Sequence, residues 1–154
     1  MIETITDFVS RFETSISLDE NSLMKKQNRL FLVDDSLKTL VSKDFFHAGT
    51  YLGKTEDGEF LPSFSLLRMI AERKANKVVV DEKTEWLFIC GRDIFRQGVI
   101  RVHGSRRKGD YTLVLNRHRE CLGFGKILFD LSGEREGVVI KNIFDIGDFL
   151  RRES

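Results

Sequence analysis

Six cationic side chains gather in one short stretch of this sequence. Between Arg101 and Arg119 the chain holds six Arg and Lys residues, and Asp110 is the one carboxylate among them. The whole chain has a formal net charge of only +1, with −2 over residues 1–75 and +3 over residues 76–154. A local basic cluster on a nearly neutral protein favours a single contact face for an anionic partner over a polycationic tail.

The cations of this stretch fall into two groups separated by an apolar segment. Arg106, Arg107 and Lys108 occupy a glycine-bounded loop, and Arg117 and Arg119 flank His118 at the expected tip of a hairpin. If the fold brings the two loops to one edge, they form a single positive patch. The alternative for each of them is an ordinary solvated surface charge, since Arg and Lys are mostly exposed.

Enzyme signatures are absent from the sequence. His47, His103 and His118 are scattered, and none is spaced from another ligand as metal sites require. Ser63 lacks the flanking glycines of a nucleophile elbow, and Gly123-x-Gly125 lacks the third glycine of a dinucleotide loop. We therefore expect no catalytic residue, no metal and no cofactor.

The hairpin that presents the second group of cations is the centre of the C-terminal half. Alternation over Thr112–Leu115 predicts a strand packed on both faces, Asn116–Glu120 forms the tip, and Ile127–Phe129 returns as a strand. Gly123 and Gly125 lie between them, and glycines there indicate a bend or a close approach of another backbone.

Further short strands surround this hairpin. They are expected at Lys77–Val80, Val99–Val102 and Gly137–Ile140, with a short helical turn at Phe144–Leu150 closing the fold. Thr84–Cys90 fits either a helix or a buried strand, because periodicity does not separate the two. The pattern predicts a small mixed β-barrel over residues 76–154.

The N-terminal half, residues 1–75, predicts an α+β layer, with a boundary at Ala75–Asn76. Expected helices cover Ile2–Phe12, a segment capped by Asp34 or Asp35 that carries Leu37, Leu40 and Val41, and Phe64–Lys74 with Ser63 as its cap. Expected strands cover Arg29–Val33, Ala48–Lys54 and Phe60–Leu61, with a tight turn at Asp57–Gly58.

Other features of the chain bear on its compartment. Cys90 and Cys121 are too far apart for a Cys-x-x-Cys motif, and we expect both to be buried thiols in a reducing compartment. No apolar run approaches the ~20 residues of a membrane span. The acidic N-terminus is unlike a signal peptide, so we expect a cytoplasmic protein, or a nucleolar one if the source is eukaryotic.

The C-terminal half resembles a PUA domain, an RNA-binding module. The resemblance lies in a Val-rich opening strand, a Gly91-x-x-x-Phe95-x-x-Gly98 turn, the Gly109-Asp110 pair, and Leu122-Gly123-x-Gly125, in that order. It implies an α+β N-terminal domain followed by a PUA-type mixed β-barrel.

Two further segments resemble the nip-seven family of large-subunit ribosome assembly factors, in an archaeal-type form. They are His47–Lys54, which contains Gly-Thr-x-x-Gly-Lys, and the ending Asp145–Glu153. The match runs from about His47 to Glu153, and residues 1–46 agree only in the order of elements.

The resemblance to this family implies a non-catalytic protein that binds U-rich, single-stranded pre-rRNA and assembly or RNA-processing proteins. We expect it to be a monomer. Arg92 and Arg96 flank the turn that borders the RNA groove of PUA domains, Lys126 adjoins Gly125, and Arg151 and Arg152 match basic positions of the family's ending. The alternative is an RNA-modifying enzyme, or its targeting subunit, that carries a PUA domain.

Overall fold

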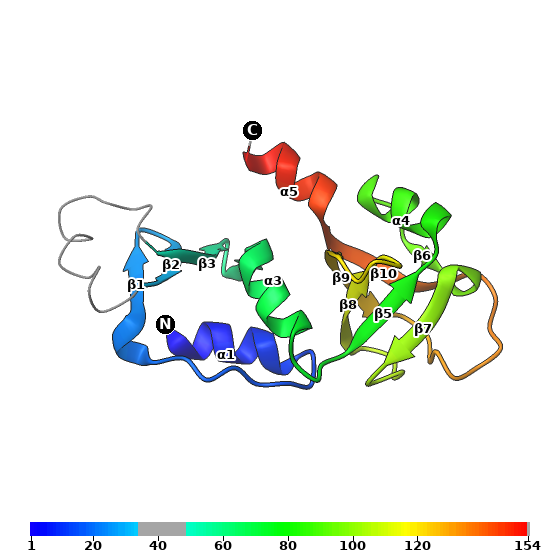
Figure 1. Cartoon of the computed structure of the whole chain (residues 1–154), viewed down its shortest axis with the longest axis horizontal. Helices are drawn as coiled ribbons and strands as arrows, with labels where there is room; N and C mark the ends of the chain where they lie inside the picture. Colours follow the sequence, from blue (N-terminus) through cyan, green and yellow to red (C-terminus); the bar gives the residue numbers. More distant parts are fainter. Residues whose placement is uncertain (34–48, 154) are drawn as a thin grey trace.

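The computed structural model describes residues 1–33 and 49–153 (Figure 1). The described part of the N-terminal half holds two α-helices, a short 3-10 helix and four strands: α1 (Ile2–Ser10), η1 (Glu20–Ser22), β1 (Leu23–Lys26), β2 (Arg29–Leu32), β3 (Thr50–Glu56), β4 (Glu59–Pro62) and α3 (Phe64–Ala71). The strands form one antiparallel sheet in the order β1-β2-β3-β4. The helix expected after Asp34 or Asp35 lies outside the described residues.

Local sequence signals are confirmed in this half. The β3–β4 hairpin turns at Asp57 and Gly58, both with positive φ (52° and 80°), as a tight two-residue turn requires. α3 begins after Ser63, whose side-chain oxygen accepts a hydrogen bond from the Leu66 amide at 3.1 Å. Both features depend on neighbouring residues alone, which is why the sequence predicts them.

The C-terminal half forms a curled, mixed six-stranded sheet. Its elements are β5 (Lys77–Val80), α4 (Glu82–Ile89), β6 (Ile94–Phe95), η3 (Arg96–Gly98), β7 (Val99–His103), β8 (Tyr111–Leu115), β9 (Cys121–Ile127), β10 (Val138–Asp145) and α5 (Ile146–Glu153). The strand order is β6-β10-β9-β8-β5-β7, and β5 and β8 are the parallel pair. The segment that fitted either a helix or a strand is the helix α4, capped by Asp81.

Several boundaries differ from the expectation: α3 ends at Ala71, before the expected Lys74, and β9 ends at Ile127, where the expected strand begins. β6 was not expected, because two residues give no periodic signal. β9 begins at Cys121 and includes both glycines, and β10 continues to Asp145, so α5 begins two residues later than the expected closing turn. The presence of a glycine inside β9 is explained by the close approach of β10. Gly123 has a φ of 145°, and a Cβ there would collide with the Phe144 carbonyl of β10.

The C-terminal sheet is buried on both faces. Alternate residues of β5 divide between two hydrophobic clusters: Val79 faces α1 and α3 of the N-terminal half, and Val78 and Val80 face α4. Phe124 of β9 belongs to the first cluster and is 3% exposed, which confirms it as a core residue. Figure 1 shows α1 and α3 lying between the two sheets.

No exposed linker marks the expected boundary between residues 1–75 and 76–154. Asn76 is buried and bridges the start of β8 to the loop after β7, donating to the Tyr111 carbonyl and accepting from the Ser105 amide. The division into two domains therefore stays a prediction.

Two observations bear on the expected compartment. Cys90 is exposed, so the expectation of a buried thiol is wrong there, whereas Cys121 is partly buried. No helix in residues 1–33 and 49–153 is long and apolar enough to cross a membrane.

Candidate nucleic-acid interface

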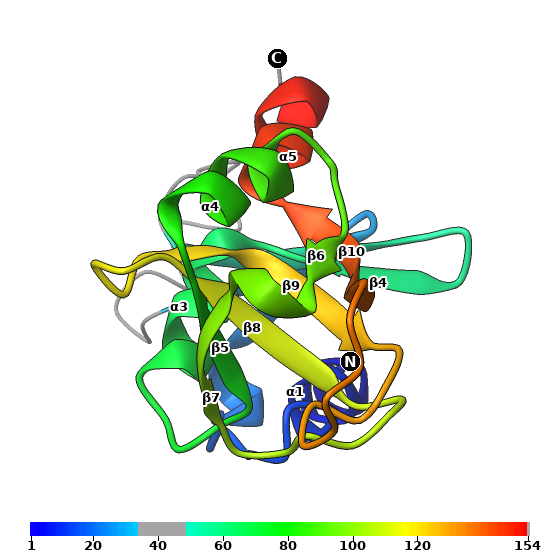
Figure 2. The ribbon, with the colours of Figure 1, turned by 90° about the vertical axis from the view of Figure 1, so that its right-hand side faces the viewer.

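Three of the ten candidate cations, Arg92, Arg96 and Arg151, lie where α4, β6, β10 and α5 meet. Arg92 follows α4 and Arg96 begins η3, so the two flank β6, which pairs with β10. β10 leads directly into α5, which carries Arg151 and Arg152. Figure 2 shows α4, β6 and α5 gathered at the upper end of the sheet. We call the residues Arg92, Phe95, Arg96 and Arg151 the turn–α5 surface.

Asn142 ties the Gly91–Gly98 turn to the strand that leads into α5. Its side-chain amide donates to the carbonyls of Phe88 and Arg92 at 2.9 and 3.4 Å, and to the Asp145 carboxylate at 3.1 Å. α5 also packs tightly against the end of α4, since a Cβ at Gly147 would collide with the Ile89 carbonyl. The backbone that carries Arg92 and leads into α5 is therefore fixed by hydrogen bonds and packing. The sequence offered no signal for the role of Asn142.

Two aromatic side chains of the C-terminal half are strongly exposed. Phe95 is 45% exposed and lies in β6 beside Arg96, and Trp86 is 65% exposed on α4. Exposed rings next to cations can stack on nucleobases while the cations contact phosphates. The sequence could not distinguish these exposed rings from buried ones, because an aromatic residue gives the same sequence pattern in either position.

The two basic loops do not form one patch. They precede and follow β8, and so lie at opposite ends of that strand. At one end, Arg107 pairs with Glu13 and with Asp110. The Glu13 carboxylate, followed by Asp110, raises the pKa of Arg107 above its usual value. Arg107 thus links the loop to the N-terminal half, while Arg106 and Lys108 are exposed.

At the other end, Asn116 organises the β8–β9 hairpin tip. Its side chain accepts hydrogen bonds from the His118 and Glu120 amides and donates to the Glu85 and Glu120 carboxylates. Arg117 is exposed among these groups, so the tip mixes both charge signs.

The Arg119 side chain extends from the same tip toward β7. Its guanidinium lies 3.5 Å from Nε2 of His103.

Lys126 occupies a separate position in the middle of the sheet. It lies opposite Lys141 on β10 and opposite Tyr111 on β8. Directly opposed residues share a face of the sheet, so two cations meet there. The cations with described side chains therefore occupy several surfaces, and the turn–α5 surface brings Arg92, Arg96 and Arg151 together with the exposed Phe95 ring.

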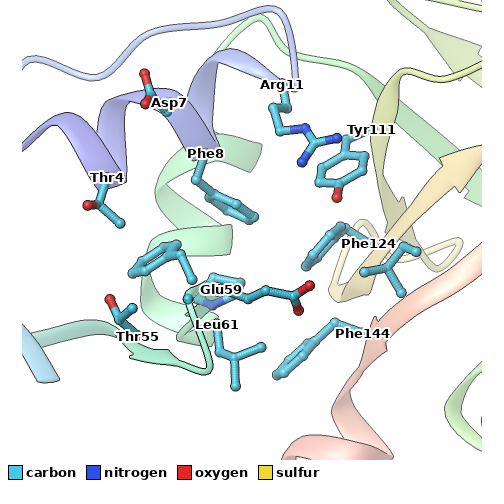
Figure 3. A pocket seen from close by; sticks show the side chains of 14 residues that line it. Thr4, Asp7, Phe8, Arg11, Thr55, Glu59, Leu61, Tyr111, Phe124 and Phe144 are labelled. Carbon is cyan, nitrogen blue, oxygen red and sulfur yellow. The ribbon is translucent and has the colours of Figure 1, made fainter. Parts of the chain in front are cut away.

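A groove of about 600 Å³ separates α1, the β3–β4 hairpin and the C-terminal sheet (Figure 3). Its walls include the rings of Phe8, Tyr111, Phe124 and Phe144, and Arg11 stacks on Tyr111 at 3.8 Å from the ring centroid. Phe8 meets Phe124 edge-to-face at 5.4 Å. These rings contact one another, so the groove marks the packed junction of the two halves.

The family model that matches the sequence is the UPF0113 PUA domain, over residues 76–154. The chain belongs to this family. A UPF0113 protein from Archaeoglobus fulgidus is 35% identical over 95 residues, which are 59% of this chain and 52% of that protein. A tRNA-guanine(15) transglycosylase from Methanosphaera stadtmanae is 25% identical over 132 residues, which are 84% of this chain and 18% of the enzyme. The chain spans about half or less of these relatives.

Solved structures confirm the fold over most of the UPF0113 chain. A conserved PUA domain protein from Thermoplasma acidophilum has a TM-score of 0.61 and 22% identity, covering 99% of this chain and 93% of that one. A PUA domain from Aeropyrum pernix K1, solved with tartrate, also has a TM-score of 0.61, with 19% identity over 94% and 82% of the two chains. The predicted class, an α+β N-terminal region followed by a PUA fold, is confirmed.

Proposed function

We propose that this protein is a non-catalytic RNA-binding factor that holds RNA on the turn–α5 surface. The observation that carries the proposal is the meeting of three cations and an exposed ring on a fold of the PUA family. The same surface uses the Gly91–Gly98 turn, which the sequence had singled out. An RNA partner by itself explains why this rigid surface presents both positive charges and a ring that can stack on a base.

Each part of the turn–α5 surface has a distinct task in this proposal. Arg92 and Arg96 contact successive phosphates on either side of β6, and Arg151 extends the positive track along α5. The resemblance to the nip-seven ending adds Arg152 to this set. Phe95 stacks on a base between them, which suits single-stranded RNA because unstacked bases expose their faces. Every base can stack on an aromatic ring, so stacking does not select uridine. The expected preference for U-rich RNA therefore depends on the flexibility of the RNA strand.

We further propose that the RNA is pre-rRNA of the large ribosomal subunit, bound in the manner of the nip-seven family. Two things support this: the resemblance at His47–Lys54 and Asp145–Glu153, and membership of a PUA family. The N-terminal half would contact assembly or RNA-processing proteins. Such a factor would work as a monomer in the cytoplasm, or in the nucleolus of a eukaryote.

A second candidate is a targeting module for RNA modification. The similarity to a tRNA-guanine(15) transglycosylase favours it, since that match takes up 84% of this chain but only 18% of the enzyme. In that case the protein would bring RNA to a catalytic domain on another polypeptide. Preferred retention of tRNA over U-rich single strands would favour this candidate.

The test is a salt titration of RNA binding with the full chain. Arg151→Gln/Arg152→Gln should weaken binding of a U-rich 12-mer about tenfold and lower the slope of log affinity against log salt by about 1.4, because each phosphate contact on a single strand contributes about 0.7. Phe95→Ala should weaken binding, by about 1–3 kcal/mol, and leave the slope unchanged.

The matched control removes two exposed cations from the β1–β2 hairpin. Lys25→Gln/Lys26→Gln changes the net charge equally and should alter neither affinity nor slope by more than the general charge effect. Equal slopes for the wild type and the Arg151/Arg152 variant would refute the assignment of this surface.

A further inference from the structure

A second group of cations lies on the other face of the C-terminal sheet, at its β7 edge. Lys77 of β5 is directly opposite His103 of β7, and Val79 is opposite Arg101. Opposed residues of an antiparallel pair share a face, and Val79 faces the N-terminal half. Lys77, Arg101 and His103 therefore project on that face, away from α4.

The hairpin tip adds a further cation, Arg119, to this group. The Arg119 guanidinium reaches to 3.5 Å from Nε2 of His103. Arg119 adopts a positive φ of 65° at the turn. We call Lys77, Arg101, His103 and Arg119 the notch.

The notch borders a hollow between the two halves of the chain. The hollow has a volume of about 570 Å³, and its lining includes Lys74, Lys77, His103 and Arg119. Glu13 also lines it, but that carboxylate pairs with Arg107. A phosphate group fits easily in a space of this size, and four of the side chains around it can donate hydrogen bonds.

The positive charges of the notch have no counterion within the described residues. No salt bridge joins Lys74, Lys77, Arg101 or Arg119 to a carboxylate in residues 1–33 and 49–153. Lys77 instead donates to the Ala71 carbonyl at the end of α3, at 2.5 Å. Like charges held close together cost free energy, and an anion placed among them would remove that cost.

The ionisation of the notch reflects this crowding. Burial, followed by the charges of Arg119, Arg101 and Lys77, lowers the pKa of His103 below its usual value. Burial and then Arg119 likewise lower the pKa of Lys77. The Arg119 guanidinium has no acceptor, so its contact with Nε2 requires the neutral imidazole.

We propose that the notch binds a phosphate group of an RNA strand, between the guanidinium of Arg119 and the imidazole of His103. Arg101 supplies further positive charge from the edge strand, and Lys77 does so while it remains bonded to the Ala71 carbonyl. This assignment rests on the proposed RNA-binding function. The notch lies on the face of the C-terminal sheet opposite to α4. An RNA that contacts both the notch and the turn–α5 surface must therefore pass around the β7 edge or the hairpin tip.

Proton linkage gives the proposal a specific signature. A bound phosphate stabilises the protonated imidazole and takes the place of the Arg119 contact at Nε2, so it raises the pKa of His103. Affinity should therefore rise as the pH falls from the higher pKa of the complex toward the lower pKa of the free protein. The charged groups that face His103 are Arg119, Arg101 and Lys77, with Lys74 and Glu13 around the hollow.

The experiment follows His103 by NMR in the full chain, with its imidazole signal assigned by His103→Gln. The pKa of His103 is measured in the free protein, in the presence of a U-rich 12-mer, and in the presence of inorganic phosphate. We expect the RNA to raise it measurably. In parallel, Arg101→Gln/Arg119→Gln should lower RNA affinity about five- to tenfold and the salt slope by about 0.7, the contribution of one phosphate contact.

Controls separate this proposal from the one on which it rests. Lys25→Gln/Lys26→Gln should leave the His103 titration unchanged, and thermal unfolding should show that the Arg101/Arg119 variant is folded, since both side chains are exposed. RNA binding with an unchanged His103 pKa and an unaffected Arg101/Arg119 variant would overturn the notch and leave the proposed function standing. A His103 response to inorganic phosphate but not to RNA would overturn the RNA assignment in favour of a small phosphate ligand. If the wild-type protein binds no RNA, both the notch assignment and the proposed function are overturned.

Discussion

The two cysteines of this chain differ in what surrounds their thiols. Cys90 is the C-cap residue of α4 and is exposed. Cys121 opens β9 and packs against the core shared by the two halves. Burial raises the pKa of the Cys121 thiol to about 11. The thiolate is the reactive species, so the two residues should respond very differently to a thiol reagent.

A thiol-specific reagent at pH 8 should label one cysteine rapidly in the folded protein. At that pH only about one Cys121 thiol in a thousand is ionised, given its pKa of about 11. A raised pKa means that the thiolate fraction grows as pH rises, so labelling of Cys121 should accelerate about tenfold per pH unit between 8 and 10. Absorbance of the released chromophore measures both phases. Cys90→Ser should abolish the fast phase, and a remaining fast phase would contradict the assignment.

At the scale of elements, α3 depends on one hydroxyl group for its start. The Ser63 side chain is buried and makes two hydrogen bonds: it accepts from the Leu66 amide at 3.1 Å and donates to the Tyr51 carbonyl of β3 at 2.6 Å. It therefore caps the helix and ties it to the N-terminal sheet. α3 also packs against β9, so its position affects how the two halves meet.

Ser63→Ala should lower the free energy of unfolding by about 1–2 kcal/mol, through the lost cap and the lost hydrogen bond to the Tyr51 carbonyl. Urea denaturation followed by circular dichroism measures the change. Ser65→Ala in the first turn of the same helix is the matched control, because that side chain is exposed, and it should change the stability by less than 0.5 kcal/mol. Equal effects of the two substitutions would show that the cap contributes little.

How far the sequence predicts an element depends on how local its causes are. The Asp57–Gly58 turn and the Ser63 cap were predicted because adjacent residues determine them. The Gly91–Gly98 turn was recognised by its spacing, but its attachment to β10 through Asn142 joins residues about 50 positions apart. No local pattern records such a contact.

The same reasoning separates the two candidate surfaces. The cations of the turn–α5 surface were named from the sequence, because each adjoins a recognisable motif. His103 and Lys77 were not, since only the β5–β7 register brings them together across 26 positions of the chain. The single patch expected from the two loops around β8 fails for a topological reason: loops before and after one strand lie at its opposite ends.

At the scale of the whole molecule, the two halves share one hydrophobic core. The first cluster combines α1 and α3 with residues of β5, β8, β9 and β10. Phe8 of α1 is central to it, with ring centroids 5.3 Å from Phe12, 5.3 Å from Phe60 and 5.4 Å from Phe124. Removing the N-terminal half would expose Phe124 and its neighbours, so the two halves should unfold together.

Phe8→Ala tests this coupling. It should cost about 3–5 kcal/mol, the usual range for a buried ring, and the loss should appear in β8 and β9 although the substitution is in α1. Hydrogen exchange measured by mass spectrometry reads the protection of each strand separately. Phe31→Ala is the control, because Phe31 is only half-buried and contacts Tyr51 within the N-terminal sheet; it should reduce protection much less. Unchanged protection of β8 and β9 in the Phe8 variant would mean that the C-terminal sheet is stable without the shared core.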